Sequence, residues 1–132
     1  MGAMIVDTDV LSDFLRGRQE AVDAVERHSQ ERPIATTDIN VFELYYGAFK
    51  SEKSERNVSK LKGFLNTIPV RSTSGDSMET AGRMAAEQEE RGERVGVKDV
   101  LIGSIASLED EPVLTRNVDE FQRLEGVELL EP

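Results

Sequence analysis

Short apolar segments of strand character alternate with longer segments of helical periodicity along the whole 132-residue chain. This alternation indicates a parallel sheet covered by helices on both faces, because parallel strands need helix-length crossovers between them. Glycine-rich and charged breaks at 71–75 and 91–96 are predicted to be surface loops. The expected strands are residues 4–6, 34–36, 67–70, 113–115 and 127–129, and the expected helices lie around 10–15, 21–25, 39–49, 58–65, 78–92 and 101–108.

The length favours a single domain over residues 1–132, large enough for a continuous core. No run approaches the ~20 apolar residues of a membrane helix, and the first apolar stretch is too short and too early for a signal peptide. The absence of cysteine fits a reducing cytoplasm, where we expect the protein to act. His28 is the single histidine, so a histidine-based zinc site or a Ser-His-Asp triad is not expected.

The net charge of −10 argues against loose binding of phosphate backbones. Sixteen lysines and arginines still permit a local basic rim, with Lys98, Arg116, Arg16 and Arg94 as candidates. The acidic surface has two interpretations, solubility or adaptation to high salt, in which long-range repulsion is screened.

Asp7 ends the apolar run of the first expected strand and is followed at once by a helical pattern. It is placed either to cap that helix or to act as a ligand at the carboxyl end of a strand, where α/β sheets bind their ligands. The abrupt change from strand to helix favours the ligand role.

Glu43 falls with Ile39, Phe42 and Tyr46 on one stripe of a predicted helix. A carboxylate inside an apolar stripe loses hydration and requires a cation or strong donors. We predict a metal ligand, and the alternative is a half-buried glutamate paired with lysine or arginine.

Two further acids lie near predicted helix starts. Asp99 opens the helix 99–108, where an anion also gains ~0.3–1 kcal/mol from the helix dipole; the small residues that follow should let this helix pack closely. Glu120 lies three residues after Asn117, the spacing of a capping box. Helix capping and a supporting metal role are both open for Glu120.

The physical argument for a metal site is that several carboxylates would lie close together. Two carboxylates ~4 Å apart repel by roughly 4 kcal/mol at an effective dielectric constant near 20, so several converge only around a cation. Oxygen ligands favour Mg²⁺, with Mn²⁺ also possible. Such an ion activates water and stabilises a leaving alkoxide, which suits phosphodiester hydrolysis.

These motifs resemble a known family. Segment 4–11, MIVDTDVL, resembles the opening strand and first acid of PIN-domain ribonucleases of the VapC toxin type. ELYYG at 43–47 matches their E-L-x-x-G helix, and DVLIGSIA at 99–106 matches D-x-L-I-x-x-x-A. TRN at 115–117 followed by EF at 120–121 resembles the T-x-N…[DE]-F terminus. Four weak motifs in family order make the resemblance specific.

The resemblance implies a PIN-like three-layer α/β/α sandwich with a five-stranded parallel sheet, and Mg²⁺- or Mn²⁺-dependent endoribonuclease activity. It also implies an RNA substrate, a cognate small antitoxin protein and a toxin homodimer. The implied catalytic acids and metal ligands are Asp7, Glu43, Asp99 and Glu120, supported by Thr115, Asn117 and Asp119. Asp9 departs from the Asn or Ser of many members, and Asp119 is an alternative to Glu120 as fourth acid.

Two other functions fit parts of the sequence. Residues 7–11 satisfy the D-x-D-x-[TV] motif of haloacid-dehalogenase-like phosphatases, with Asp7 as nucleophile and Asp9 as general acid/base. The downstream acidic pair of that family is missing. A PIN-like module that only binds is the second alternative, and the complete set of four acids argues against it.

Overall fold

The computed structural model describes residues 2–132, and in this range five strands form one sheet in which each neighbouring pair is parallel. The strand order is β3-β2-β1-β4-β5. The strands are β1 (Met4–Val6), β2 (Ile34–Thr37), β3 (Val70–Arg71), β4 (Val113–Leu114) and β5 (Leu129–Leu130). The helices are α1 (Thr8–Leu15), α2 (Gln19–Ser29), α3 (Asp38–Lys50), α4 (Ser54–Leu65), α5 (Gly75–Glu90), α6 (Val97–Glu109) and α7 (Val118–Phe121).

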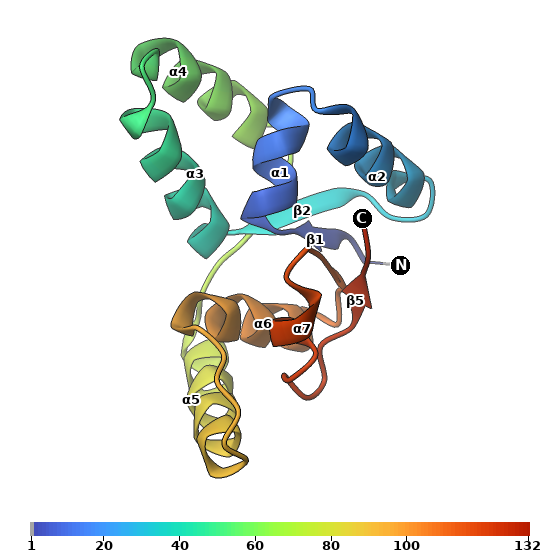
Figure 1. The fold of residues 1–132 in the computed structure, drawn as a ribbon, viewed down its shortest axis with the longest axis vertical. Coiled ribbons are helices and arrows are strands. Elements are labelled where there is room, and N and C mark those ends of the chain that lie inside the picture. Colours follow the sequence, from blue (N-terminus) through green and yellow to red (C-terminus); the bar gives the residue numbers. More distant parts are fainter. Residues whose placement is uncertain (1) are drawn as a thin grey trace.

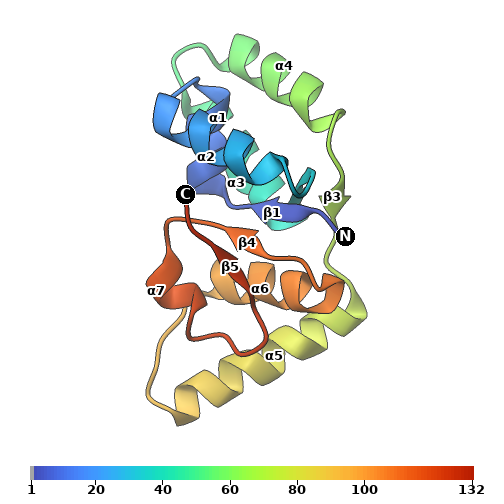
Figure 2. The same ribbon diagram turned by 90° about the vertical axis from the view of Figure 1, so that its right-hand side faces the viewer.

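The sheet separates two helical layers, as Figures 1 and 2 show. Side chains alternate along a strand, so β1 contributes to both cores. Met4 and Val6 pack with residues of α1, α2, α3 and α4, whereas Ile5 packs with α5, α6 and Phe121 of α7. The predicted parallel sheet and α/β/α sandwich are thereby confirmed.

The path of the chain through the sheet determines where a cleft opens. From β1 the chain moves outward to β2 and β3, then returns to β4 on the other side of β1. The carboxyl ends of β1 and β4 therefore flank the point where the strand order reverses. In open α/β sheets ligands bind at this point.

The strand prediction at 67–70 was wrong for its first three residues. The backbone N–H and the hydroxyl of Thr67 both donate to the carbonyl of Phe64, which extends the turn at the end of α4. Pairing with β2 begins at Val70. The strand expected at 4–6 is confirmed at both ends, and the bounds of the other three differ by only one or two residues.

The loop predicted at 71–75 is also shorter than expected. Arg71 is paired with β2 and forms a bidentate ion pair with buried Glu111, while Gly75 already belongs to α5. The predicted loop at 91–96 is confirmed. Gly92 adopts φ +70° just after α5, a left-handed conformation that suits glycine at a helix end.

The apolar stripe predicted on α3 faces the core only at its first residue, Ile39, which is partly buried. Phe42, Tyr46 and Phe49 are 57–66% exposed, whereas Leu44 is buried and packs with α1 and α4. The reason is that α3 meets its neighbours through a face rotated away from the aromatic residues. Among residues 2–132, no helix has the length and apolar character needed to cross a membrane.

Candidate active site

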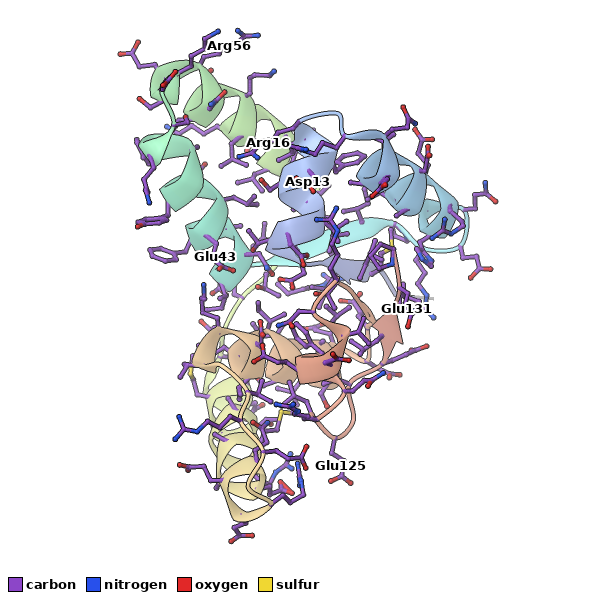
Figure 3. The ribbon with its side chains drawn as sticks, in the orientation of Figure 1. Asp13, Arg16, Glu43, Arg56, Glu125 and Glu131 are labelled. Carbon is purple, nitrogen blue, oxygen red and sulfur yellow. The ribbon has the colours of Figure 1, made fainter. Side chains whose placement is uncertain are left out.

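An open cleft of about 600 Å³ lies at the carboxyl ends of β1 and β4. It brings together three of the four predicted acids, which come from β1–α1, α3 and α6. Figure 3 shows Glu43 in the half of α3 that lies nearer the layer of α5 and α6. The cleft is lined by Asp7, Thr8, Asp9, Glu43, Lys98, Asp99, Arg116 and Asn117.

Asp7 is the most enclosed acid of the cleft, with 7% of its surface exposed. One carboxylate oxygen, Oδ1, accepts hydrogen bonds from the backbone N–H of Thr8 (2.8 Å) and from Asn40 Nδ2 (2.9 Å). The other, Oδ2, accepts from the hydroxyl of Thr115 (2.7 Å). Asp7 is thus both the N-cap of α1 and a cleft residue. Burial raises its pKa, and Thr115 opposes this effect.

Glu43 is half-buried and bridges two elements. Its Oε1 accepts from the Thr8 hydroxyl at 2.8 Å, and its Oε2 pairs with Lys98 Nζ at 2.5 Å. The hydrogen bond and charge of Glu43 raise the pKa of Lys98. The lysine pairing that the sequence left open for Glu43 is therefore present, although the buried stripe that motivated the metal assignment is not.

Asp99 and Glu120 meet at Asn117. The Nδ2 group of Asn117 donates to Asp99 Oδ2 and to Glu120 Oε2, each at 2.6 Å. Of the two roles left open for Glu120, the capping box with Asn117 does not form. Although Asn117 is the N-cap of α7, its side chain makes no capping hydrogen bond, because the amide turns toward the two carboxylates instead.

This arrangement changes the protonation of both acids. Partial burial, the hydrogen bond to Glu120 and the charge of Asp7 together raise the pKa of Asp99 to about 7. Hydrogen bonds to Asn117 and Asp99 lower the pKa of Glu120. Asp99 is therefore partly protonated near neutral pH, whereas Glu120 is ionised.

Thr115, Asp119 and Asp9 differ in how closely they approach the acids of the cleft. Thr115 is fully buried, donates to Asp7 and accepts from the backbone N–H of Asn117 at 3.0 Å. Asp119 is exposed, whereas Glu120 contacts the network through Asn117. Asp9 lines the cleft and accepts from the backbone N–H of Arg116.

Sequence reasoning missed Asn40 and the part played by Thr8. Asn40 is fully buried on α3 and donates to both Asp7 and Thr8. The spacing of Thr37 and Asn40 is that of a capping box, which the structure confirms. That spacing was a readable signal for the helix start, although not for the contact with Asp7, which is 33 residues away.

The donor set suits a hard divalent cation by its chemistry, since carboxylate oxygens are the preferred ligands of Mg²⁺. Burial is the largest cause of the raised pKa of both Asp7 and Asp99, and the neighbouring carboxylates raise both values further, so a bound cation would stabilise the ionised form of each acid. In the part of the chain that the structure describes, no three acidic or histidine side chains already stand at metal-binding separation. Asn117 donates to both Asp99 and Glu120, and Lys98 pairs with Glu43, so these contacts offset part of the repulsion among the carboxylates.

Comparison with known proteins gives a consistent result. The sequence matches the PIN domain family over residues 4–127. It is 35% identical to ribonuclease VapC2 of Rickettsia felis over 76% of this chain and 75% of that protein. It is 32% identical to the tRNA(fMet)-specific endonuclease VapC of Salmonella typhimurium over 70% of each.

Solved structures agree with the sequence matches. The fold superimposes with a TM-score of 0.87 on VapBC2 of Rickettsia felis bound to a DNA fragment from its promoter, at 29% identity and covering 100% of this chain and 99% of that one. It superimposes with a TM-score of 0.86 on VapBC-1 of nontypeable Haemophilus influenzae, at 25% identity and covering 99% and 98%.

Proposed function

The chain belongs to the PIN-domain family, as a ribonuclease toxin of the VapC type, and from this premise we propose that it hydrolyses RNA phosphodiester bonds with a divalent metal ion. The observation that supports this most directly is the meeting of Asp7, Glu43 and Asp99 on one cleft at the switch point of the sheet. The phosphatase alternative is not favoured, because the matching family is a different one.

Asp7, Glu43 and Asp99 are the residues that would hold the ion, Mg²⁺ or Mn²⁺, with Glu120 as the fourth acid. When bound, the ion would supply a more acidic water and stabilise charge on the phosphate and the leaving oxygen. The chain's own residues prepare this site: Asn117 orients Asp99 and Glu120, and Thr115 orients Asp7.

Lys98 and Arg116 give the acidic cleft two cationic side chains, which are 61% and 42% exposed. Both are engaged by carboxylates, Lys98 by Glu43 and Arg116 by Asp13 at 2.8 Å. Exposed ion pairs of this kind are worth little, so exchange for a phosphate is inexpensive. We propose that these two residues bind the RNA backbone beside the acids.

Cleavage assays with and without Mg²⁺ or Mn²⁺ test the proposal, using a tRNA pool and single-stranded RNA oligonucleotides. Wild-type protein is expected to cleave only with the metal, and Asp99→Asn is expected to lose at least 100-fold in rate. Glu125→Gln is the matched control, since Glu125 is exposed and lies far from Glu43 in Figure 3. Metal-independent cleavage, or full activity of Asp99→Asn, would refute the assigned site.

We infer a small antitoxin as partner, as in the VapBC complexes that this fold resembles. A groove of about 390 Å³ between α1, α3 and α4 supports this inference, because it shares Thr8 and Glu43 with the cleft. An antitoxin tail lying there would bring a basic side chain to the acids, where a guanidinium pairs bidentately with a carboxylate. Co-purified partner that leaves metal affinity unchanged would contradict this mechanism.

A homodimer is the remaining partner prediction. Phe42, Tyr46 and Phe49 are large apolar side chains of α3 that are exposed, and we propose that two copies of the chain meet through them. Light scattering is expected to give twice the 14.7 kDa chain mass. The double variant Phe42→Ser, Phe49→Ser should then give a monomer.

A further inference from the structure

Asn40 is a buried polar residue whose full hydrogen-bonding capacity is used. Its Oδ1 accepts from the hydroxyl of Thr37 at 2.7 Å and from the Thr37 backbone N–H. Its Nδ2 donates to Asp7 Oδ1 at 2.9 Å and to Thr8 Oγ1 at 2.8 Å. An asparagine amide has two donors and two accepting lone pairs, so every one of them is occupied.

The partners determine which way the amide faces. The backbone N–H of Thr37 can only donate, so the atom beside it must be the carbonyl oxygen of Asn40. The NH₂ group therefore faces Asp7 and Thr8. The reversed amide would place its oxygen against the Asp7 carboxylate, where two acceptors repel.

The same amide reaches Glu43 through Thr8. Because the Thr8 hydroxyl accepts from Asn40, its own hydrogen is free to donate to Glu43 Oε1 at 2.8 Å. Asn40 thus donates to Thr8, which in turn donates to Glu43, and Asn40 also donates directly to Asp7. These contacts connect the acid at the end of β1 with the acid on α3.

Only the amide oxygen of Asn40 takes part in the capping box of α3, and its NH₂ group does not. Helix α5 begins with a capping box of the same geometry, in which Ser77 takes the place of Asn40 and Ser74 that of Thr37. A hydroxyl is therefore enough to start a helix in this protein. The NH₂ group of Asn40 is additional, and both of its hydrogens are directed to the acid network.

We propose that Asn40 and Thr8 are positioning residues that hold Asp7 and Glu43 in fixed relation for metal binding, an inference that rests on the proposed function. Both donors are neutral, so they orient the carboxylates without adding a cation that would compete with the metal. Lys98 differs in this respect, since it neutralises the Glu43 carboxylate that it contacts.

Two variants separate positioning from folding. Asn40→Ser retains a capping residue of the kind seen in α5 but is too short to reach Asp7 and Thr8. Thr8→Val removes the hydroxyl at nearly constant shape and leaves Asn40 in place. Ser77→Ala weakens the capping box of α5 without touching the cleft, so it is the matched control for helix capping.

Calorimetric titration with Mn²⁺ and the split between kcat and KM on an RNA oligonucleotide are the readouts, together with melting in the absence of metal. Loss of contacts behind metal ligands typically costs ~10–100-fold in metal affinity or activity. We expect Asn40→Ser and Thr8→Val to weaken Mn²⁺ binding by that factor and to lower kcat with KM within about twofold. Thr8→Ser should recover part of the loss, and Ser77→Ala should change only the melting temperature.

Unchanged Mn²⁺ affinity and kcat in Thr8→Val would overturn the positioning role, and this variant decides the question if Asn40→Ser does not fold. A wild-type protein that neither binds Mn²⁺ nor cleaves RNA would overturn the proposed function together with this inference. Wild-type cleavage with unaffected variants would overturn the inference alone.

Discussion

Asp99 is the residue through which the stability of the metal-free protein should depend on pH. Its pKa rises from 3.8 to about 7 on folding, mainly because of burial and the acids around it. The folded state therefore binds this proton more tightly than the unfolded chain does. The stability that the proton supplies is complete below pH 3.8 and is lost as the pH rises through 7.

Replacing Asp99 with asparagine should remove this dependence. Between pH 4 and 8, metal-free wild type is expected to lose about 1–2 kcal/mol of unfolding free energy relative to Asp99→Asn, after allowing for the partial exposure of the carboxyl group. Denaturant unfolding at several pH values with a chelator present measures the difference. Parallel curves for the two proteins would show that Asp99 does not titrate in this range.

For single residues, the sequence identifies the acids of the cleft better than the residues that orient them. Asp7 and Asp99 were recognisable because each stands at the edge of an element with a clear pattern. Asn40 was not, because a polar residue in the first turn of a helix is ordinarily explained by capping. Its second function appears only when the fold brings α3 against the end of β1.

The close contact of α6 with the segment after α7 predicts a specific packing defect. A Cβ at Gly103 would stand 2.5 Å from Cδ1 of Leu124, which is buried. Gly103→Ala should therefore destabilise by about 1–3 kcal/mol through overpacking. In Gly82→Ala nothing lies within 4 Å of the added methyl on α5, so helix propensity should stabilise by about 0.5–1 kcal/mol. Thermal unfolding of both variants tests the sign of each change.

The ion pair between Arg71 and Glu111 connects β3 with the loop before β4. Glu111 is 4% exposed and also accepts from the backbone N–H of Ala3, so its carboxylate joins three parts of the sheet. Glu111→Ala should cost about 3 kcal/mol, because it leaves a buried donor and part of a guanidinium unpaired. Glu87→Ala is the matched control.

Glu87 pairs with Arg83 on the surface of α5, where an exposed i,i+4 pair contributes about 0.3–0.5 kcal/mol. Denaturant midpoints of the two alanine variants therefore compare a buried pair with an exposed one. Similar losses in both would show that burial of Glu111 contributes little.

The sequence predicts which segments form helices and which form strands. It does not predict which side of a helix is buried or the exact residues at which an element begins and ends. The apolar periodicity of α3 correctly predicts a helix, but it also predicts that the stripe around Glu43 loses its hydration. Phe42 and Tyr46 are instead exposed and stacked on each other, with ring centroids 6.3 Å apart. Periodicity gives an apolar stripe, and only the packing of α1 and α4 decides which side of α3 is buried.

At the scale of the whole molecule, the charge of −10 should make salt and metal act differently on stability. Monovalent salt screens repulsion everywhere on the surface, so it should stabilise wild type and Asp99→Asn alike. A divalent ion bound in the cleft adds a term that needs intact acids. The two contributions are separable because only the second depends on a particular residue.

Divalent metal should accordingly raise the melting temperature of the wild type beyond the effect of salt. At ~100 times Kd, binding to the native state contributes about 2.7 kcal/mol, which is roughly 8–12 °C for a domain of this size. Asp99→Asn should show only the increase given by NaCl at matched ionic strength, and Glu125→Gln should behave as the wild type. Thermal scans with NaCl measure the contribution of screening, and scans with MgCl₂ or MnCl₂ at the same ionic strength add the contribution of binding in the cleft. An equal increase with MgCl₂ in wild type and Asp99→Asn would mean that the ion screens the acidic surface and that the cleft does not hold it.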